Sequence, residues 1–128
     1  MNIPADLKYS KTHEWIRVDG NKASIGISDY AQSELGDIVY VETPEVGDEF
    51  AKGEELAMID SAKTTAQIYA PVDCTVTGVN GKLGDKPELV NSDPYGDGYM
   101  LEVELKNPSQ IEEMMDSTAY TDFVESGD

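Results

Sequence analysis

The chain consists of short segments in which hydrophobic and polar residues alternate, separated by turns that contain glycine or proline. Residues 13–18 and 22–27 flank Asp19-Gly20-Asn21, and Asp-Gly is typical of a tight β-hairpin turn. Further extended segments are predicted at 37–43, 55–61, 66–70, 72–79 and 99–105. Short strands spaced about 8–12 residues apart indicate a β-sandwich or barrel rather than an α/β fold.

Strict alternation also predicts which side chains face the core. In segment 37–43, alternation places Ile38, Tyr40 and Glu42 on one face of the strand. Val39 and Val41 then point to the opposite face. The residues that we expect in or against the core are Ile38, Val41, Ile59, Val76, Tyr99 and Leu101.

A short helix and a long loop interrupt the strands. Ser28 is a preferred N-cap residue, and Gly36 suits the left-handed end of a helix, so a helix is predicted over 29–35. Residues 84–98 contain two prolines and three glycines and are predicted to be a loop.

The C-terminal part is predicted to be helical. Asn107 and Pro108 form a helix start, with proline in the first turn. The apolar residues of this helix are Ile111, Met114 and Met115. A second short helix is expected to contain Tyr120, Phe123 and Val124. The tail 125–128 is expected to be frayed.

Composition limits the possible partners. Of 128 residues, 26 are acidic and nine are basic, which gives a net charge of −17. Nucleic acid is excluded as a partner because binding to phosphates requires lysine and arginine, and an anionic membrane is disfavoured for the same reason. No apolar run approaches the roughly 20 residues of a membrane helix, and no basic start precedes an apolar stretch. We expect a single domain over 1–128, monomeric and in the bacterial cytoplasm, with a mature mitochondrial protein less favoured.

Few residues offer the chemistry of an enzyme. The one cysteine, Cys74, cannot form an internal disulfide and is expected to be a small buried residue. The one histidine, His13, is expected to be structural or exposed rather than catalytic. Carboxylates are so numerous that no acid–base pair stands out. We therefore expect no catalytic residue and no metal site.

Lys63 is the residue with the clearest chemical potential. It is one of only eight lysines and lies between two extended segments, where no other charged residue occurs from 61 to 67. An ordinary exposed turn lysine is one interpretation. A lysine displayed for covalent attachment of a swinging cofactor, lipoamide or biotin, is the other.

Several motifs follow one another along nearly the whole chain. They include Thr12-His13-Glu14-Trp15, Leu35-Gly36-Asp37-Ile38-Val39, Pro87-Glu88-Leu89-Val90-Asn91 and Asp93-Pro94-Tyr95-Gly96. In these motifs and their order, the chain resembles the glycine cleavage system H proteins. The resemblance implies a barrel-sandwich hybrid: mainly β, with antiparallel sheets, a short helix and C-terminal helices.

The resemblance also implies a carrier function rather than catalysis. Lipoate attached to Lys63 would accept an aminomethyl group from the pyridoxal-phosphate glycine decarboxylase (P-protein). It would deliver the group to the tetrahydrofolate-dependent aminomethyltransferase (T-protein), and dihydrolipoyl dehydrogenase (L-protein) would reoxidise the dithiol. A lipoate-attaching enzyme is the fourth implied partner.

The sequence departs from the family pattern around this lysine. H proteins typically have Glu-Ser-Val-Lys-Ala, whereas Lys63 is surrounded by Asp60, Ser61, Ala62 and Thr64, the residues expected to direct recognition of the hairpin. Gln67, Cys74 and Tyr99 also replace the usual residues. A lipoate relay for other complexes therefore stays an alternative, as do an unmodified interaction module and a biotin carrier, whose lysine is usually flanked by methionine.

Glu14 is the second candidate site residue, because the family carries this acid in the matching motif. Its carboxylate could hydrogen-bond the ammonium of an aminomethylated arm in a sheltering cleft. The alternative is an outward-facing residue beside a core Trp15. The high negative charge likewise has two interpretations: steering toward basic partners, or solubility and adaptation to salt.

Overall fold

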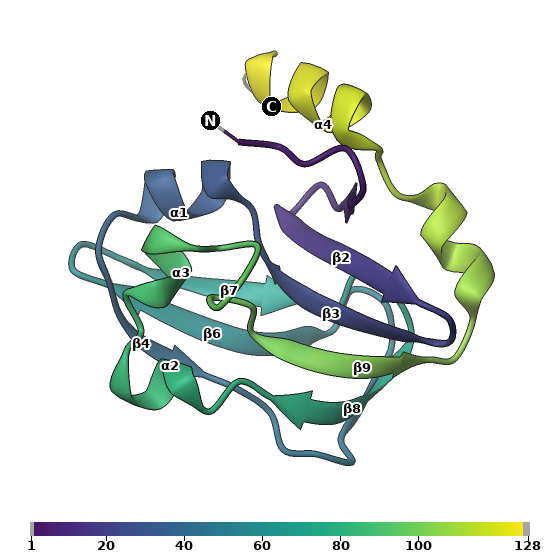
Figure 1. Cartoon of the computed structure of the whole chain (residues 1–128), viewed down its shortest axis with the longest axis horizontal. Coiled ribbons are helices and arrows are strands. Elements are labelled where there is room, and N and C mark those ends of the chain that lie inside the picture. The colour runs from purple at the N-terminus through teal and green to yellow at the C-terminus, as the bar shows by residue number, and fades with distance from the viewer. Residues whose placement is uncertain (1, 127–128) are drawn as a thin grey trace.

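The computed structural model describes residues 2–126, whose strands form two antiparallel sheets (Figure 1). The larger sheet has the order β1 (Lys8–Tyr9), β2 (Glu14–Asp19), β3 (Lys22–Ile27), β9 (Leu101–Leu105), β8 (Cys74–Val79) and β5 (Glu49–Phe50). The smaller sheet has the order β4 (Ile38–Glu42), β6 (Glu55–Ser61) and β7 (Thr65–Tyr69). The two-residue strands β1 and β5 had no periodic signal in the sequence.

Short helices accompany the sheets. They are α1 (Asp29–Leu35), α2 (Lys82–Asp85), α3 (Leu89–Ser92), the 3₁₀ helix η1 (Pro108–Glu113) and α4 (Ser117–Glu125). None of these helices combines the length and apolar character needed to cross a bilayer. The predicted mainly β fold, with antiparallel sheets, a short helix and C-terminal helices, is confirmed.

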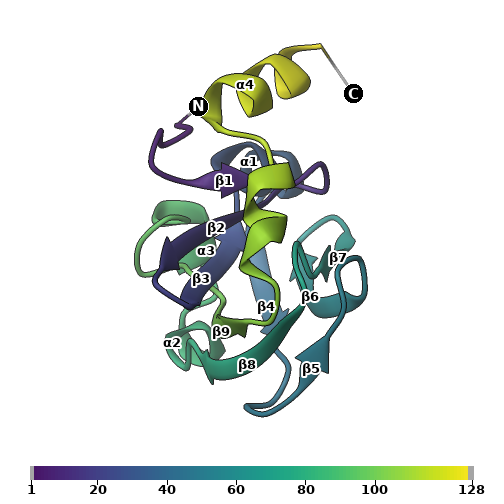
Figure 2. The same ribbon diagram turned by 90° about the vertical axis from the view of Figure 1, so that its right-hand side faces the viewer.

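The main core lies between the two sheets. Figure 2 shows β6 and β7 on one side of the molecule and β2 and β3 on the other. Alternate residues of β9 point inward, and Leu101, Val103 and Leu105 are buried. The predicted core residues Ile38, Val41, Ile59, Val76 and Leu101 are all buried. Tyr99 packs against a second, aromatic cluster.

This second cluster joins the N-terminal segment to α4, which lies above β1 in Figure 2. The Tyr9 and Tyr120 rings stack with their centroids 4.6 Å apart. Trp15 is fully buried and donates its indole N–H to the Pro94 carbonyl at 3.0 Å. Aromatic packing of this kind adds to the stabilisation from apolar burial.

Local signals correctly predicted the first hairpin and α1. The β2–β3 hairpin pairs Asp19 with Lys22, and Gly20 has φ 65 in the two-residue turn. The Ser28 side chain accepts the Ala31 N–H at 3.2 Å at the start of α1. Gly36 ends the helix with φ 79, a conformation that favours glycine.

The predicted alternation in β4 was wrong. Its pairing with β6 shifts between Ile38 and Tyr40, which marks a β-bulge. Ile38 and Val41 are consequently buried, whereas Val39 and Tyr40 are both exposed. A bulge inserts one residue into the two-residue period, so strict alternation fails across it.

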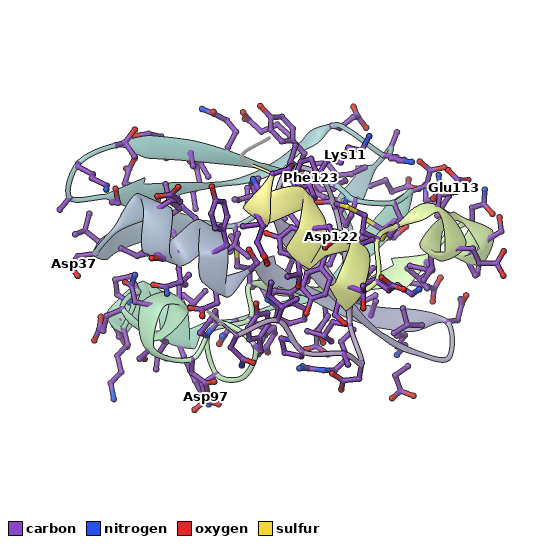
Figure 3. The ribbon with its side chains drawn as sticks, turned by 90° about the horizontal axis from the view of Figure 1, so that it is seen from above. Lys11, Asp37, Asp97, Glu113, Asp122 and Phe123 are labelled. Carbon is purple, nitrogen blue, oxygen red and sulfur yellow. The ribbon has the colours of Figure 1, made fainter. Side chains whose placement is uncertain are left out.

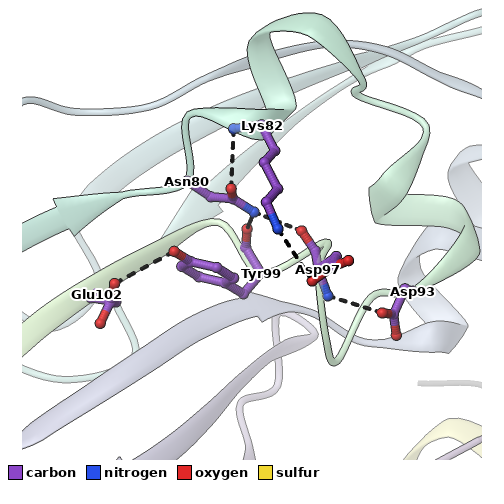
Figure 4. Close-up of polar contacts among 6 residues, drawn as sticks. All are labelled: Asn80, Lys82, Asp93, Asp97, Tyr99 and Glu102. Atoms are coloured by element: carbon purple, nitrogen blue, oxygen red, sulfur yellow. Dashed lines mark hydrogen bonds and ion pairs between the residues drawn. The ribbon is translucent and has the colours of Figure 1, made fainter.

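The predicted loop over 84–98 was partly wrong, because it contains α3 and the end of α2. The buried side chains of Leu83 and Val90 hold these short helices against the main core. The Asn80 amide donates to the carbonyls of Asp97 and Tyr99, each at 2.7 Å (Figure 4). Tertiary packing thus orders a segment whose glycines and prolines suggested a loop.

The first predicted C-terminal helix was also corrected. It is a 3₁₀ helix that ends at Glu113, and the Asn107 side chain does not cap it. Met115 instead exchanges two backbone hydrogen bonds with Tyr9 of β1, at 2.8 and 3.0 Å, so its N–H is not available to a continuing helix. The predicted second helix, α4, is confirmed.

The structure describes the first two residues of the tail 125–128, which was expected to be frayed. Glu125 is the last residue of α4, and the following Ser126 donates its backbone N–H to the Asp122 carbonyl at 3.0 Å. Residues 127 and 128 lie outside the described residues.

Candidate functional site

Lys63 lies at the tip of the β6–β7 hairpin, where the sequence predicted it. Ala62, Lys63 and Thr64 are exposed, whereas Ser61 is buried and organises the turn. The Ser61 N–H donates to the Thr64 carbonyl at 2.8 Å, and the Ser61 hydroxyl oxygen accepts the Thr64 N–H at 3.1 Å. The side chain of Lys63 is therefore presented from a closed, hydrogen-bonded turn.

The predicted recognition residues surround this lysine. Asp60 pairs with Thr65 across the hairpin, and the Thr65 hydroxyl donates to the Asp60 carboxylate at 2.5 Å. Small residues on both sides, Ala62 and Thr64, leave the lysine side chain accessible from the solvent.

The tip is anchored to the segment between α1 and β4. The Ala62 N–H donates to the Asp37 carbonyl at 2.9 Å. Figure 3 shows Asp37 at the same end of the molecule as this hairpin. Gly36 lies against the lysine, because a Cβ atom placed there would be 3.5 Å from Lys63 Cε.

Asn91 of α3 is a supporting residue that sequence reasoning noted only as part of a motif. Its side-chain amide donates to the Gly36 carbonyl at 2.8 Å and to Gln32 Oε1 at 2.9 Å. Its carbonyl oxygen accepts the Ile38 N–H at 2.9 Å. Asn91 thus fixes the α1–β4 junction that anchors the hairpin. The feature of the sequence that could have indicated this role is an amide side chain directly after the apolar residues Leu89 and Val90.

Glu14 is fully buried, so the alternative that it faces outward is wrong. Its carboxylate accepts hydrogen bonds from the hydroxyls of Ser10, at 2.5 Å, and Thr12. The Tyr69 N–H also donates to it, at 3.2 Å. Burial raises the pKa of this carboxyl above its ordinary value, although the hydrogen bonds oppose the increase.

The structure does not bring Glu14 and Lys63 into contact. The Glu14 carboxylate accepts a hydrogen bond from Tyr69, the last residue of β7, whereas Lys63 lies before Thr65, the first residue of that strand, with Thr64 between them. Five residues of β-strand span about 17 Å. A bare lysine side chain cannot bridge this separation, and only an extended arm on Lys63 could.

A cavity of about 600 Å³ lies at the Glu14 end of β7. Its lining includes Ser10, Thr12 and Tyr69, the three residues that donate to the Glu14 carboxylate. The buried Glu14 carboxylate is therefore hydrogen-bonded directly to residues of the cavity wall.

His13 has a structural role in the aromatic cluster. Its Nδ1 lies 2.8 Å from the Tyr120 hydroxyl, which in turn lies 2.6 Å from the Ser28 hydroxyl. Burial lowers the pKa of His13. The backbone of His13 has φ 73, so the residue turns the chain into β2 and joins it to α4.

Cys74 is buried, as predicted, and burial raises the pKa of its thiol to about 11. This side chain is therefore not a reactive thiolate near neutral pH. Within residues 2–126, no group of three or more histidine, cysteine or acidic side chains is placed to hold a metal ion.

An accessible lysine on the anchored hairpin of a β-sandwich is the arrangement expected of the class of carrier domains with a covalently attached arm. The family model described as glycine cleavage H-protein matches residues 7–127. A glycine cleavage system H protein from Symbiobacterium thermophilum is 49% identical, with 98% of each chain covered. A probable glycine cleavage system H protein from Haloarcula marismortui is 47% identical, over 97% of this chain and 98% of the relative.

Comparison with solved structures agrees with these matches. The crystal structure of a glycine cleavage system H protein from Mycobacterium marinum has a TM-score of 0.85 and 32% identity. The match covers 92% of this chain and 95% of that chain. The chain therefore belongs to the glycine cleavage H-protein family, and it has the lipoyl-carrier role of that family in the glycine cleavage system.

Proposed function

We propose that Lys63 is the lipoyl attachment site and that the chain carries the aminomethyl group of glycine between the enzymes of the system. The anchored, exposed hairpin tip is the observation that carries this proposal. Its amine is accessible, and the ion pairs within residues 2–126 involve Lys52, Lys82 and Lys106 instead. Accessibility and the lack of an ion pair within residues 2–126 both suit an amine that is to become an amide.

A lipoyl group on Lys63 would supply a dithiolane that accepts the aminomethyl group from the P-protein and releases it to the T-protein. The L-protein would then restore the disulfide. The chain's own residues present the arm and catalyse none of these steps. We place this monomeric carrier in the bacterial cytoplasm.

The hydrogen bonds of the tip have a mechanical purpose in this proposal. Ser61 closes the turn, and the Asp37 carbonyl fixes it to the protein body. A fixed attachment point confines the arm to a limited volume and so raises its effective concentration at each partner site.

Glu14 is proposed to stabilise the loaded arm. A carboxylate offers about four acceptor positions. In the Glu14 carboxylate, three of these positions are taken by donors from Ser10, Thr12 and Tyr69. Oε2 accepts only the Tyr69 N–H among these three, so it has room for an ammonium donor. The adjoining cavity offers the arm an approach to the residues around this carboxylate.

Intact-mass measurement of the protein from its native host tests the attachment. A lipoyl adduct that maps to Lys63 supports the proposal, whereas a biotinyl adduct or an unmodified lysine contradicts it. Incubation of the lipoylated protein with P-protein and glycine should then add an aminomethyl group. Lipoylation without this loading would instead support the alternative of a lipoate relay for other complexes.

A further inference from the structure

The turn that leads into Glu14 contains an unfavourable backbone conformation. Among residues 2–126, His13 is the only residue other than glycine with a positive φ, which is 73. In this left-handed region the Cβ atom of an ordinary residue crowds the following carbonyl oxygen. Residues in such conformations persist only where the surrounding structure holds them, and they cluster at functional sites.

The conformation of His13 determines where the Glu14 carboxylate lies. In the turn, the His13 N–H donates to the Ser10 carbonyl at 3.1 Å, and the Ser10 N–H donates to the Glu14 carbonyl at 2.9 Å. The hydroxyls of Ser10 and Thr12, in the same turn, both donate to Oε1 of Glu14. Two of the three donors to this carboxylate therefore depend on the shape of the turn, which residue 13 sets.

Side chains of α1 and α4 hold His13 from outside the turn. Nδ1 of His13 lies 2.8 Å from the Tyr120 hydroxyl, and this hydroxyl lies 2.6 Å from the Ser28 hydroxyl. The rings of Tyr30 in α1 and Phe123 in α4 pack against the imidazole, with centroids 5.0 and 5.9 Å from it. Phe123 is labelled on α4 in Figure 3. One hydrogen bond and aromatic packing thus fix the imidazole.

Tyr120 is itself fixed and can therefore serve as an anchor. Its side chain is fully buried, and its ring stacks on Tyr9. Ser28, whose hydroxyl it contacts, donates its backbone N–H to the His13 carbonyl at 2.9 Å. His13 is consequently held by Tyr120 through its side chain and by Ser28 through its backbone, and these two anchors are hydrogen-bonded to each other.

We infer that His13 and Tyr120 are positioning residues for the Glu14 carboxylate, an inference that rests on the proposed role of Glu14 in stabilising the loaded arm. Tyr120 is not a donor to that carboxylate and acts on it through His13 and the turn. The contacts of the imidazole offset the unfavourable φ. Without them, residue 13 relaxes toward negative φ, and the hydroxyls of Ser10 and Thr12 move away from Oε1.

The lifetime of the aminomethylated arm, measured as release of ammonia and formaldehyde, tests this inference. Tyr120→Phe removes only the hydroxyl and keeps the ring that stacks on Tyr9. It should shorten the lifetime about fivefold, which is equivalent to about 1 kcal/mol of backbone strain. Tyr95→Phe is the matched control and should keep the wild-type lifetime. Tyr95 lies in the same aromatic cluster, and its hydroxyl also makes two hydrogen bonds, with the Asp29 N–H and the Asn2 carbonyl.

A pair of substitutions at residue 13 separates backbone strain from packing. His13→Ala and His13→Gly both remove the imidazole, but only alanine keeps the Cβ atom that disfavours the left-handed conformation. His13→Ala should shorten the lifetime about as much as Tyr120→Phe, whereas His13→Gly should stay within about twofold of the wild type. Thermal unfolding identifies a misfolded variant, and if His13→Ala misfolds, the comparison of Tyr120→Phe with Tyr95→Phe decides.

Titration of the Glu14 carboxyl, followed by NMR of its carboxyl carbon in the unlipoylated protein, reports its position independently of the arm. In Tyr120→Phe and His13→Ala, the pKa of Glu14 should fall toward its ordinary value of 4.5, because water reaches the displaced carboxylate. In His13→Gly and Tyr95→Phe, the pKa should stay raised. A merely structural role of Tyr120 in the aromatic cluster would leave this pKa unchanged.

The outcomes separate this inference from the proposed role of Glu14. If Glu14→Ala has the wild-type lifetime, the role of Glu14 in stabilising the arm is wrong, and the titration alone decides the positioning. A pKa of Glu14 that stays raised in Tyr120→Phe overturns the inference, whatever the lifetime. Equal effects of Tyr120→Phe and Tyr95→Phe, or of His13→Ala and His13→Gly, also overturn it, because a general loss of stability then explains the result.

Discussion

The two ends of strand β7 differ in how they expose polar groups. At the Thr65 end, the Lys63 tip is exposed, and backbone hydrogen bonds hold its turn. At the Tyr69 end, the Glu14 carboxylate is completely buried and accepts hydrogen bonds from three donors. Hydrogen bonds at the first end hold the backbone of the turn and leave the Lys63 side chain accessible. Hydrogen bonds at the second end hold the Glu14 side chain itself.

This difference indicates two separate tasks. A group that must visit several enzymes needs an accessible attachment point on a stable base. A group that must shelter a charged cargo needs an acceptor withdrawn from water, where electrostatic interactions are stronger. We therefore expect variants at the two ends to affect different steps.

The largest effect is expected from Lys63→Arg, which should abolish lipoylation. A guanidinium remains protonated at neutral pH and cannot act as the acyl acceptor. Intact mass after incubation with ligase, lipoate and ATP measures the result. Any lipoyl adduct on the variant would place the attachment site elsewhere.

Glu14→Ala should leave lipoylation unchanged but shorten the lifetime of the loaded arm about ten- to a hundredfold. The reason is loss of a charge-assisted hydrogen bond of about 1.5–3 kcal/mol. Release of ammonia and formaldehyde from the loaded protein measures this lifetime. Glu104→Ala, an exposed position on β9, is the control, and equal release from all three proteins would exclude Glu14 from the site.

Asn91→Ala should lower the free energy of unfolding by about 1–3 kcal/mol, because the Gly36 carbonyl and the Ile38 N–H lose their partner. Denaturation by urea measures this loss. Amide exchange at Ala62 should also accelerate, since its acceptor Asp37 lies in the loosened junction. Asn107→Ala, at an exposed position, provides the comparison, and unchanged exchange would disprove the anchoring role of Asn91.

The free energy of unfolding should depend on pH through the buried Glu14 carboxyl, and Glu14→Gln should remove this dependence. The pKa of Glu14 is raised in the folded protein above its ordinary value of 4.5. The associated stabilisation is therefore complete below 4.5 and is lost as pH rises through the folded-state pKa. Denaturation from about pH 4 to about pH 7 should show the wild type losing stability relative to the variant. A constant difference would contradict the raised pKa.

The smallest expected effect is that of salt on association with the partner enzymes. If the net charge of −17 steers docking, association rates should fall several-fold with rising ionic strength. Screening at 0.15 M acts beyond about 8 Å, so dissociation should change less. Rates that are independent of salt would leave solubility or salt adaptation as the purpose of the charge.

The sequence was most informative where local chemistry determines the backbone. Ser28 and Gly36 set the ends of α1 because a hydroxyl cap and a left-handed glycine act within one turn of the helix. Alternation over 99–105 identified β9 (Leu101–Leu105) and the burial of Leu101, since one face of that strand packs on the core. The position of Lys63 followed from two extended segments joined by small residues.

Contacts between distant segments decided the features that local sequence signals did not predict. The Ile38–Tyr40 bulge depends on pairing between β4 and β6, and η1 ends where Met115 binds β1. Glu14 is buried because residues 10–12 and β7 enclose its carboxylate. Sequence alone therefore determined the strand pattern and the displayed lysine, whose signals lie within a few residues. Only the tertiary structure decided which polar group is buried and which apolar pair is exposed, because both depend on neighbours far away in the chain.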